Sequence, residues 1–200
     1  MTKKEFELKN IGFNNEREYL SNFYNSPFKY GDILFNNVEQ AFQEMKQSNK
    51  DVLIKFSKLS ASEAKREGRR ITLRRDWEKV KDIIMTRLVN YKFKQNSNLL
   101  NKLMQEDDSN LVEYNYWHDN YWGHCLCEEC KDKEKKNKLG KILKSIKYEE
   151  KSNSDLIENL NKIENVYNKS IYYIDEYGDI SLRNDFLKYI VTSFVNYNNL

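Results

Sequence analysis

The feature that most constrains the fold is the amphipathic segment DWEKVKDIIMTRLVNYKF, residues 76–93. Asp76 is a suitable N-cap, because its side chain can accept hydrogen bonds from the first free amides of a helix. Large apolar side chains then recur at helical spacing and form one stripe along the segment. The sequence therefore predicts a long helix that buries this stripe, which consists of Trp77, Val80, Ile84, Leu88 and Tyr91.

Shorter patterns of the same kind fill the rest of the first 150 residues. Asn36 or Asn37 can cap a helix over residues 36–47, in which Glu39 and Gln43 share a polar face. Turn residues around Pro27 break residues 11–35 into short extended segments. Further helices are expected over residues 60–68, from Ser97 onward and over residues 139–147, and a short strand over residues 111–115.

The character of the chain changes after Lys151. Residues 151–200 carry five basic and seven acidic side chains, a net charge of −2, so the first 150 residues carry +5 of the total of +3. We expect a helix from residue 152, a hairpin that turns at residues 177–179 and a last helix over residues 183–195. This organisation predicts a main domain over residues 1–150 and a small helix-hairpin-helix extension over residues 151–200.

Composition excludes several classes of protein. An aromatic content of 14% argues against bulk disorder. Since 34 basic residues nearly balance 31 acidic ones, the chain lacks the charge excess that is typical of duplex-binding proteins, although residues 65–75 could form a local anion site. No apolar run has the length of a membrane span and the first ten residues do not resemble a signal peptide, so we expect a cytoplasmic protein without membrane contact.

The three cysteines lie within six residues, in the segment His124-Cys125-Leu126-Cys127-Glu128-Glu129-Cys130. A zinc site made of His124 and the three cysteines is one interpretation. Four ligands within seven residues would be cramped, however, and structural zinc sites usually draw ligands from two separated knuckles. We therefore favour reduced loop thiols and expect neither a metal nor a cofactor. Cysteine nucleophilic catalysis, with His118 or His124 as the base, is the weaker alternative.

Four segments place polar or aromatic side chains beside turns. In chain order they are YLSNFYNSPF (19–28), FNNVEQAFQEMK (35–46), ASEAKREGR with the DWEKVKDIIM that follows it (61–85), and DNYWG…KNKLGKIL (119–143). Together they resemble the NADAR (YbiA-like) family over about residues 11–148. The resemblance implies an α+β fold, mostly helical with a small β-sheet. It also implies hydrolysis of N-glycosidic bonds, in ADP-ribose attached to guanine or in ribosylated phosphate intermediates of riboflavin synthesis.

Matching the motifs residue by residue gives the expected catalytic groups. Glu39 corresponds to the family's catalytic Glu, Trp77 to its helix Trp, and Asp119 to the acidic residue of D-x-x-W-G. This chain has Gln40 where the family usually has His after the catalytic Glu, and a Gln cannot shuttle a proton. Gln40 thus keeps open a third hypothesis, a module that binds ADP-ribose-like nucleotides without turnover.

Physical chemistry supports a role for Glu39. Cleavage of a ribosyl C–N bond develops positive charge on the sugar, which a carboxylate can support as stabiliser, nucleophile or base. Glu39 lies in the first turn of its expected helix, where free amides favour an ionised carboxylate. The alternative, an ordinary surface Glu at a helix start, would be favoured without the accompanying motifs.

The remaining motif residues predict a substrate site. Lys and Arg side chains can hold phosphates, Trp77 and Trp122 can stack on a base or wall off the sugar, and Asn or Asp side chains can orient ribose hydroxyls. For each residue a structural alternative exists: core packing for Trp77, a turn for Asp119 and a solvated basic face for the cations. The expected ligands are an ADP-ribose-like or ribosyl-phosphate substrate and ADP-ribosylated nucleic acid, bound by Asn22, Phe23, Lys46, Lys65, Arg69, Trp122, Gly123 and Asn137.

Overall fold

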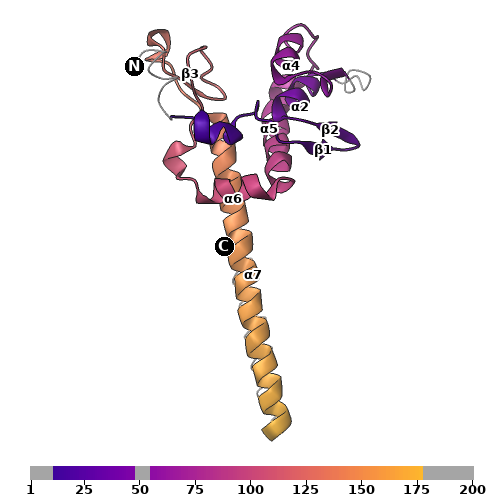
Figure 1. Ribbon diagram of the computed structural model, residues 1–200. Helices are drawn as coiled ribbons and strands as arrows, with labels where there is room; N and C mark the ends of the chain where they lie inside the picture. Colours follow the sequence, from indigo (N-terminus) through magenta and orange to yellow (C-terminus); the bar gives the residue numbers. More distant parts are fainter. Residues whose placement is uncertain (1–10, 48–54, 178–200) are drawn as a thin grey trace. The chain divides into compact units, whose positions relative to one another are not determined.

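A computed structural model of the chain describes residues 11–47 and 55–177 (Figure 1). The predicted α+β class, mostly helical with little sheet, is confirmed. The helices are α2 (Val38–Glu44), α4 (Ala61–Glu67), α5 (Trp77–Lys94), α6 (Ser97–Gln105) and α7 (Lys138–Tyr177). The strands are β1 (Phe28–Tyr30), β2 (Ile33–Phe35), β3 (Tyr114–Asn115) and β4 (His124–Cys125), and three 3-10 turns are η1 (Asn15–Leu20), η2 (Asp108–Asn110) and η3 (Glu128–Cys130).

The two short helices α2 and α4 begin close to the positions expected from the sequence, and Asn37, one of the two predicted caps, is the N-cap of α2. Asn37 accepts a hydrogen bond from the backbone N–H of Gln40 at 2.9 Å. Ser60 and Glu63 form a reciprocal capping box at the start of α4. Every residue of α2 is buried, including its polar ones, because the helix packs against both α4 and α5. A polar side chain on α2 therefore lies inside the protein and not on a solvated face.

The long helix α5 is confirmed, but its buried stripe differs in part from the predicted one. Trp77 and Leu88 are buried as expected, whereas Tyr91 is exposed and Phe93 is fully buried. The reason is the hairpin β1-β2, which pairs antiparallel with Phe28 opposite Phe35 and packs on the C-terminal half of α5. The Tyr30 ring meets the Tyr91 ring edge-on at a centroid distance of 5.5 Å, so the hairpin half-covers Tyr91.

The strands β3 and β4 form a separate parallel pair, with Tyr114 opposite His124 and Asn115 opposite Cys125. The predicted strand over residues 111–115 is thus present only at its C-terminal end. Around this pair the chain has little regular structure, and side-chain hydrogen bonds to the backbone hold its course. This irregular segment carries one wall of the pocket described below.

The C-terminal prediction needs correction. Residues 138–177 form one continuous helix, α7, drawn in orange in Figure 1, so no helix starts anew at residue 152 and residues 171–177 are not a hairpin arm. Nothing in residues 138–177 breaks a helix after its start: the stretch has one glycine, in the first turn, and no proline. The rest of the predicted hairpin and the last helix lie outside the described residues.

By its contacts the chain divides into two units, residues 1–148 and 149–200. The first unit contains a core of aromatic and aliphatic side chains from the strands β1 and β2, from α2, α5 and α6, and from the first turns of α7. Among the described residues, no helix contains a stretch apolar and long enough to cross a bilayer.

Candidate active site

A pocket of about 530 Å³ opens between α2, α4 and the irregular segment that follows η2. Eight of the eleven residues predicted to act on or bind a substrate line it, namely Asn22, Phe23, Glu39, Lys46, Lys65, Arg69, Asp119 and Trp122. These residues come from segments almost one hundred positions apart. The fold therefore brings the motif residues together around one cavity, although their individual roles stay predictions.

Glu39 lies in the pocket and is only 5% exposed. Its Oε1 accepts a hydrogen bond of 2.6 Å from Nε2 of Gln43, one turn further along α2. Burial raises the pKa of Glu39, and the charges of Lys65, Lys46 and Arg69 and the Gln43 bond oppose that rise. Burial thus outweighs the effect of the helix start on which the sequence argument relied. A carboxylate with a raised pKa is a stronger base than an exposed one.

Three cations line the pocket beside Glu39. Lys65 lies above the Phe23 ring, with Nζ 5.0 Å from the ring centroid. Lys46 donates from Nζ to the carbonyl oxygen of Gly68 at 3.3 Å, and burial lowers the pKa of Lys46 against the opposing pull of Glu39. Arg69 follows Gly68 directly. This arrangement suits an anion such as a phosphate, because cations on one wall attract it while Glu39 stays within reach.

Two further acids, Glu113 and Asp119, line the pocket. Burial, and then the charges of Asp119 and Glu39, raise the pKa of Glu113 to about 8 against the opposing charge of Lys65. Glu113 therefore carries a proton at neutral pH. Asp119 accepts from the backbone N–H groups of Tyr121 and Trp122 at 3.0 and 2.9 Å, so it forms the expected turn and lines the pocket as well.

Two buried amide oxygens in the pocket have no hydrogen-bond partner within the described residues: Oδ1 of Asn22 and Oε1 of Gln43. Buried polar atoms are almost always paired, so an unpaired pair of acceptors in a cavity indicates a missing donor. Sugar hydroxyl groups are donors of this kind. Asn22 fits its predicted role, since its Nδ2 is held by the sulfur of Met85 at 3.4 Å.

Three predicted site residues do not line the pocket. The Trp77 ring is buried 5.1 Å from the Phe42 ring, and Phe42 in turn meets Trp122 at 5.4 Å, so Trp77 supports the aromatic wall from behind. Gly123 packs so closely that a Cβ atom would lie 2.3 Å from the carbonyl oxygen of Glu113. Trp77 and Gly123 therefore pack against other parts of the protein and not against the pocket.

Asn137 is the third. Its Oδ1 accepts from the backbone N–H of Glu113 at 3.1 Å, and its Nδ2 donates to the carbonyl of Leu111 at 3.0 Å. Both amide groups of the side chain are thus occupied by the backbone. Asn137 does not orient a ligand; it fixes the strand segment from which Glu113 projects.

Gln40, the departure from the family pattern, is also outside the pocket. Its Oε1 accepts from the N–H of Asn36 at 2.7 Å, and its Nε2 donates to the carbonyl of Leu59. A neutral His also offers one acceptor and one donor nitrogen, so it could make the same two bonds. The geometry gives Gln40 a positioning role, because its side chain ties the start of α2 to the backbone of Asn36 and Leu59.

Sequence reasoning missed several pocket residues, above all Glu113 and Gln43. No local pattern marks Glu113. It lies directly before β3, and only contacts with distant segments bring this part of the chain to the pocket. Gln43 had a signal in its i, i+4 spacing from Glu39, which places both side chains on one helix face. The other missed lining residues are Phe13, Asn14, Ser21, Phe42, Met85, Tyr114 and Trp117.

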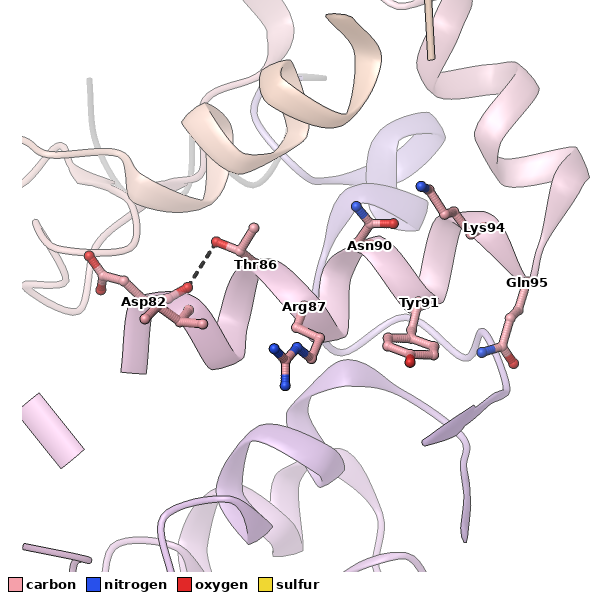
Figure 2. A pocket seen from close by; sticks show the side chains of 8 residues that line it. Asp82, Thr86, Arg87, Asn90, Tyr91, Lys94 and Gln95 are labelled. Carbon is pink, nitrogen blue, oxygen red and sulfur yellow. Dashed lines mark hydrogen bonds between the residues drawn. The ribbon is translucent and has the colours of Figure 1, made fainter. Parts of the chain in front are cut away.

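A second, more open groove of about 710 Å³ runs along α5 (Figure 2). Its lining comes from one exposed helix face between Asp82 and Gln95, where Thr86 donates to the carbonyl of Asp82 at 2.8 Å. It has no buried titratable group, so its size does not make it the better candidate.

His124, a ligand in the less favoured zinc interpretation of the sequence, is not part of the cysteine cluster. Its ring packs beside the Tyr114 ring at 5.1 Å. His124 and Cys125 are neighbours on β4, and successive side chains of a strand point to opposite faces. The described residue that does lie with the three cysteines is His118.

Comparisons with known proteins identify the family of this chain. The family model of the NADAR domain matches residues 11–149, which is more than half of the chain. The chain belongs to the NADAR domain family. The solved structure of the E. coli protein YbiA is similar, with a TM-score of 0.61 and 27% sequence identity over 72% of this chain and 84% of that chain. No curated protein matches the sequence. The NADAR match spans every residue that lines the pocket, including the acids Glu39, Glu113 and Asp119.

Proposed function

We propose that this NADAR protein is an N-glycoside hydrolase that removes ADP-ribose from guanine, in a nucleoside or in nucleic acid. The observation that carries the proposal is one pocket that combines buried Glu39, protonated Glu113 and three cations. Glycoside hydrolysis needs two carboxyl groups in different protonation states, one to support the sugar cation and one to protonate the leaving group. Membership of the NADAR family supports the same class of reaction.

The reaction breaks the bond between the anomeric carbon and a nitrogen of the base. The bonding electron pair leaves with the base, which takes a proton from Glu113. Glu39 in its carboxylate form, which the charges of Lys65, Lys46 and Arg69 favour, stabilises the positive charge on the sugar and accepts a proton as water adds its oxygen to the anomeric carbon. Each group then has the protonation state opposite to its starting one, and exchange with solvent restores both.

The walls of the pocket fit the remaining parts of the substrate. Lys46, Lys65 and Arg69 attract the phosphates, and the unpaired oxygens of Asn22 and Gln43 accept hydrogen bonds from ribose hydroxyls. Trp122 offers an aromatic face for a base, since its other contacts come from Phe42 and Tyr121.

A ribosylaminopyrimidine phosphate of riboflavin metabolism is the second candidate substrate, because the same cations could hold its single phosphate. Purified protein is incubated in parallel with ADP-ribosylated guanosine, ADP-ribosylated DNA and the pyrimidine compound, and the released sugar phosphate is quantified. We expect release of free ADP-ribose and none by Glu39→Gln. Binding without release by the wild-type protein would instead support the nucleotide-binding module, and release only from the pyrimidine compound would support the second substrate.

A further inference from the structure

Three cysteines and one histidine converge beside the candidate active site. The Sγ atoms of Cys125 and Cys127 are 3.2 Å apart, and Nδ1 of His118 lies 3.2 Å from Sγ of Cys127 and 3.5 Å from Sγ of Cys130. All four ligand atoms lie within 4.8 Å of one another. We propose that His118, Cys125, Cys127 and Cys130 bind a structural zinc ion.

The spacing of the four atoms fits tetrahedral zinc. Zinc binds thiolate sulfur at about 2.3 Å and imidazole nitrogen at about 2.0 Å, which places the atoms of a tetrahedron of three sulfurs and one nitrogen about 3.5–3.8 Å apart. The nitrogen–sulfur separations of 3.2 and 3.5 Å and the sulfur–sulfur separation of 3.2 Å are at or slightly below these values, so a small outward movement of the side chains would admit the ion.

The ligands come from two segments, which removes the objection that four ligands within one short run are cramped. Cys125 ends β4, Cys127 precedes the 3-10 turn η3 and Cys130 is its last residue, whereas His118 belongs to the loop before β4. Three thiolates and one imidazole form a Cys3His set, which is a common structural zinc set without an open position for substrate.

The loop around His118 is built to present its ring. His118 has a φ of 65°, in the left-handed region that a non-glycine residue adopts only when its surroundings hold it there. Oδ1 of buried Asn115 accepts from the backbone N–H groups of Trp117 and Asp119, on either side of His118, each at 3.2 Å. The Asn115 side chain thus holds the backbone on both sides of His118 and maintains its left-handed conformation.

The second nitrogen of the His118 ring has a partner of the right kind. Nε2 of His118 lies 3.8 Å from Oε2 of Glu129. Metal-bound histidines usually direct their other N–H to a carboxylate or carbonyl, which fixes the ring orientation and the nitrogen that binds the metal. Glu129 lies between two of the cysteines in sequence and would do so here.

Zinc at this place would fix a wall of the pocket. His118 is the direct neighbour of Trp117 and Asp119, both of which line the cavity, and the cysteines follow Trp122. An ion that ties residue 118 to residues 125–130 restrains the loop between them at both ends. The binding of zinc itself does not depend on the proposed hydrolase activity.

The test uses the full chain, purified without chelator, and measures metal content. We expect about one zinc ion per chain and, after exchange for Co²⁺, the visible absorption bands of tetrahedral cobalt bound to three thiolates. The matched pair of variants is His118→Gln and His124→Gln, two histidines of the same region. Zinc affinity falls about 10²-fold or more in the first and stays unchanged in the second.

Several results would overturn the proposal. They are a chain that retains no zinc after excess Zn²⁺ and dialysis, a cobalt spectrum without thiolate bands, equal affinities of the two histidine variants, and a Cys125–Cys127 disulfide in place of free thiols. The cobalt spectrum of the wild-type chain needs no variant, so the test stands even if His118→Gln does not fold.

Discussion

The two walls of the pocket are built by different means. One wall is the helix pair α2 and α4, in which Asn37 and the Ser60–Glu63 box cap the helices and Glu39 is held by Gln43. The other is the irregular segment around β3, in which Asn115, Asp119 and Asn137 bind backbone groups in place of a regular ladder. The comparison shows a carboxylate on a rigid helix that faces a wall maintained by polar side chains and, as we propose, by zinc.

The largest change in kcat is expected from a substitution in the irregular wall. Replacement of the proton donor in Glu113→Gln should lower kcat roughly 10²-fold, within the range of general acid catalysis. Because the pKa of Glu113 is about 8, wild-type kcat should also fall as the pH rises through 8. The variant should lack this alkaline limb, which a pH–rate profile checks. An unchanged limb in Glu113→Gln would assign the proton donor to another group.

Activity should also depend on the close packing of Gly68, which follows α4, against Gln43 of α2. A Cβ atom at Gly68 would lie 2.0 Å from Oε1 and 2.9 Å from Cβ of Gln43. Gly68→Ala should therefore displace Gln43 from Glu39, lowering kcat about 10-fold and the free energy of unfolding by about 1–3 kcal/mol.

The matched control is Gly31→Ala in the turn between β1 and β2. Gly31 has a φ of 60° and nothing within 4 Å of its absent Cβ, so alanine there is strained without touching the pocket. We expect a loss of about 1 kcal/mol and no change in kcat. Equal activity losses in the two glycine variants would show that the Gly68 effect is general destabilisation.

A smaller effect should distinguish phosphate binding from catalysis. Lys65→Met removes a cation from the pocket, so KM for a phosphate-bearing substrate should rise about 10-fold with little change in kcat. The exposed neighbour Arg66 lies on the same helix and outside the pocket, and Arg66→Met is the control. A loss of affinity in both variants would indicate a diffuse effect of charge.

The last prediction concerns stability and leaves activity at the pocket unchanged. Glu44, at the end of α2, is buried, neither of its carboxylate oxygens has a partner within the described residues, and burial raises its pKa to about 8. Since the folded state then binds a proton that the unfolded state releases above pH 4.5, the Glu44 contribution to stability falls as the pH rises from 4.5 to 8.

Glu44→Gln should remove this slope, up to about 1.4 kcal/mol per pH unit, and make the variant more stable than the wild type at pH 8. Urea unfolding at several pH values from 4 to 8 measures it. Parallel curves for the two proteins would contradict the raised pKa.

The two walls also differ in how far the sequence predicts them. Local signals predicted most of the helical wall: the cap at Asn37, the shared face of Glu39 and Gln43 and the helix over residues 60–68 each follow from neighbouring residues. The irregular wall depends on distant contacts, such as Asn137 binding the backbone of Glu113. The sequence could not reveal Glu113 or choose His118 over His124, because strand pairing decides which side chains meet.

The most direct test of the central claim, that Glu39 carries the chemistry, separates binding from bond cleavage. Wild type and Glu39→Gln are each mixed in excess with ADP-ribosylated guanosine, and the release of free ADP-ribose in a single turnover is followed beside the Kd. We predict a rate roughly 10²–10⁴-fold lower in Glu39→Gln, with a Kd within about threefold of the wild type. Wild-type rates in Glu39→Gln would contradict the account.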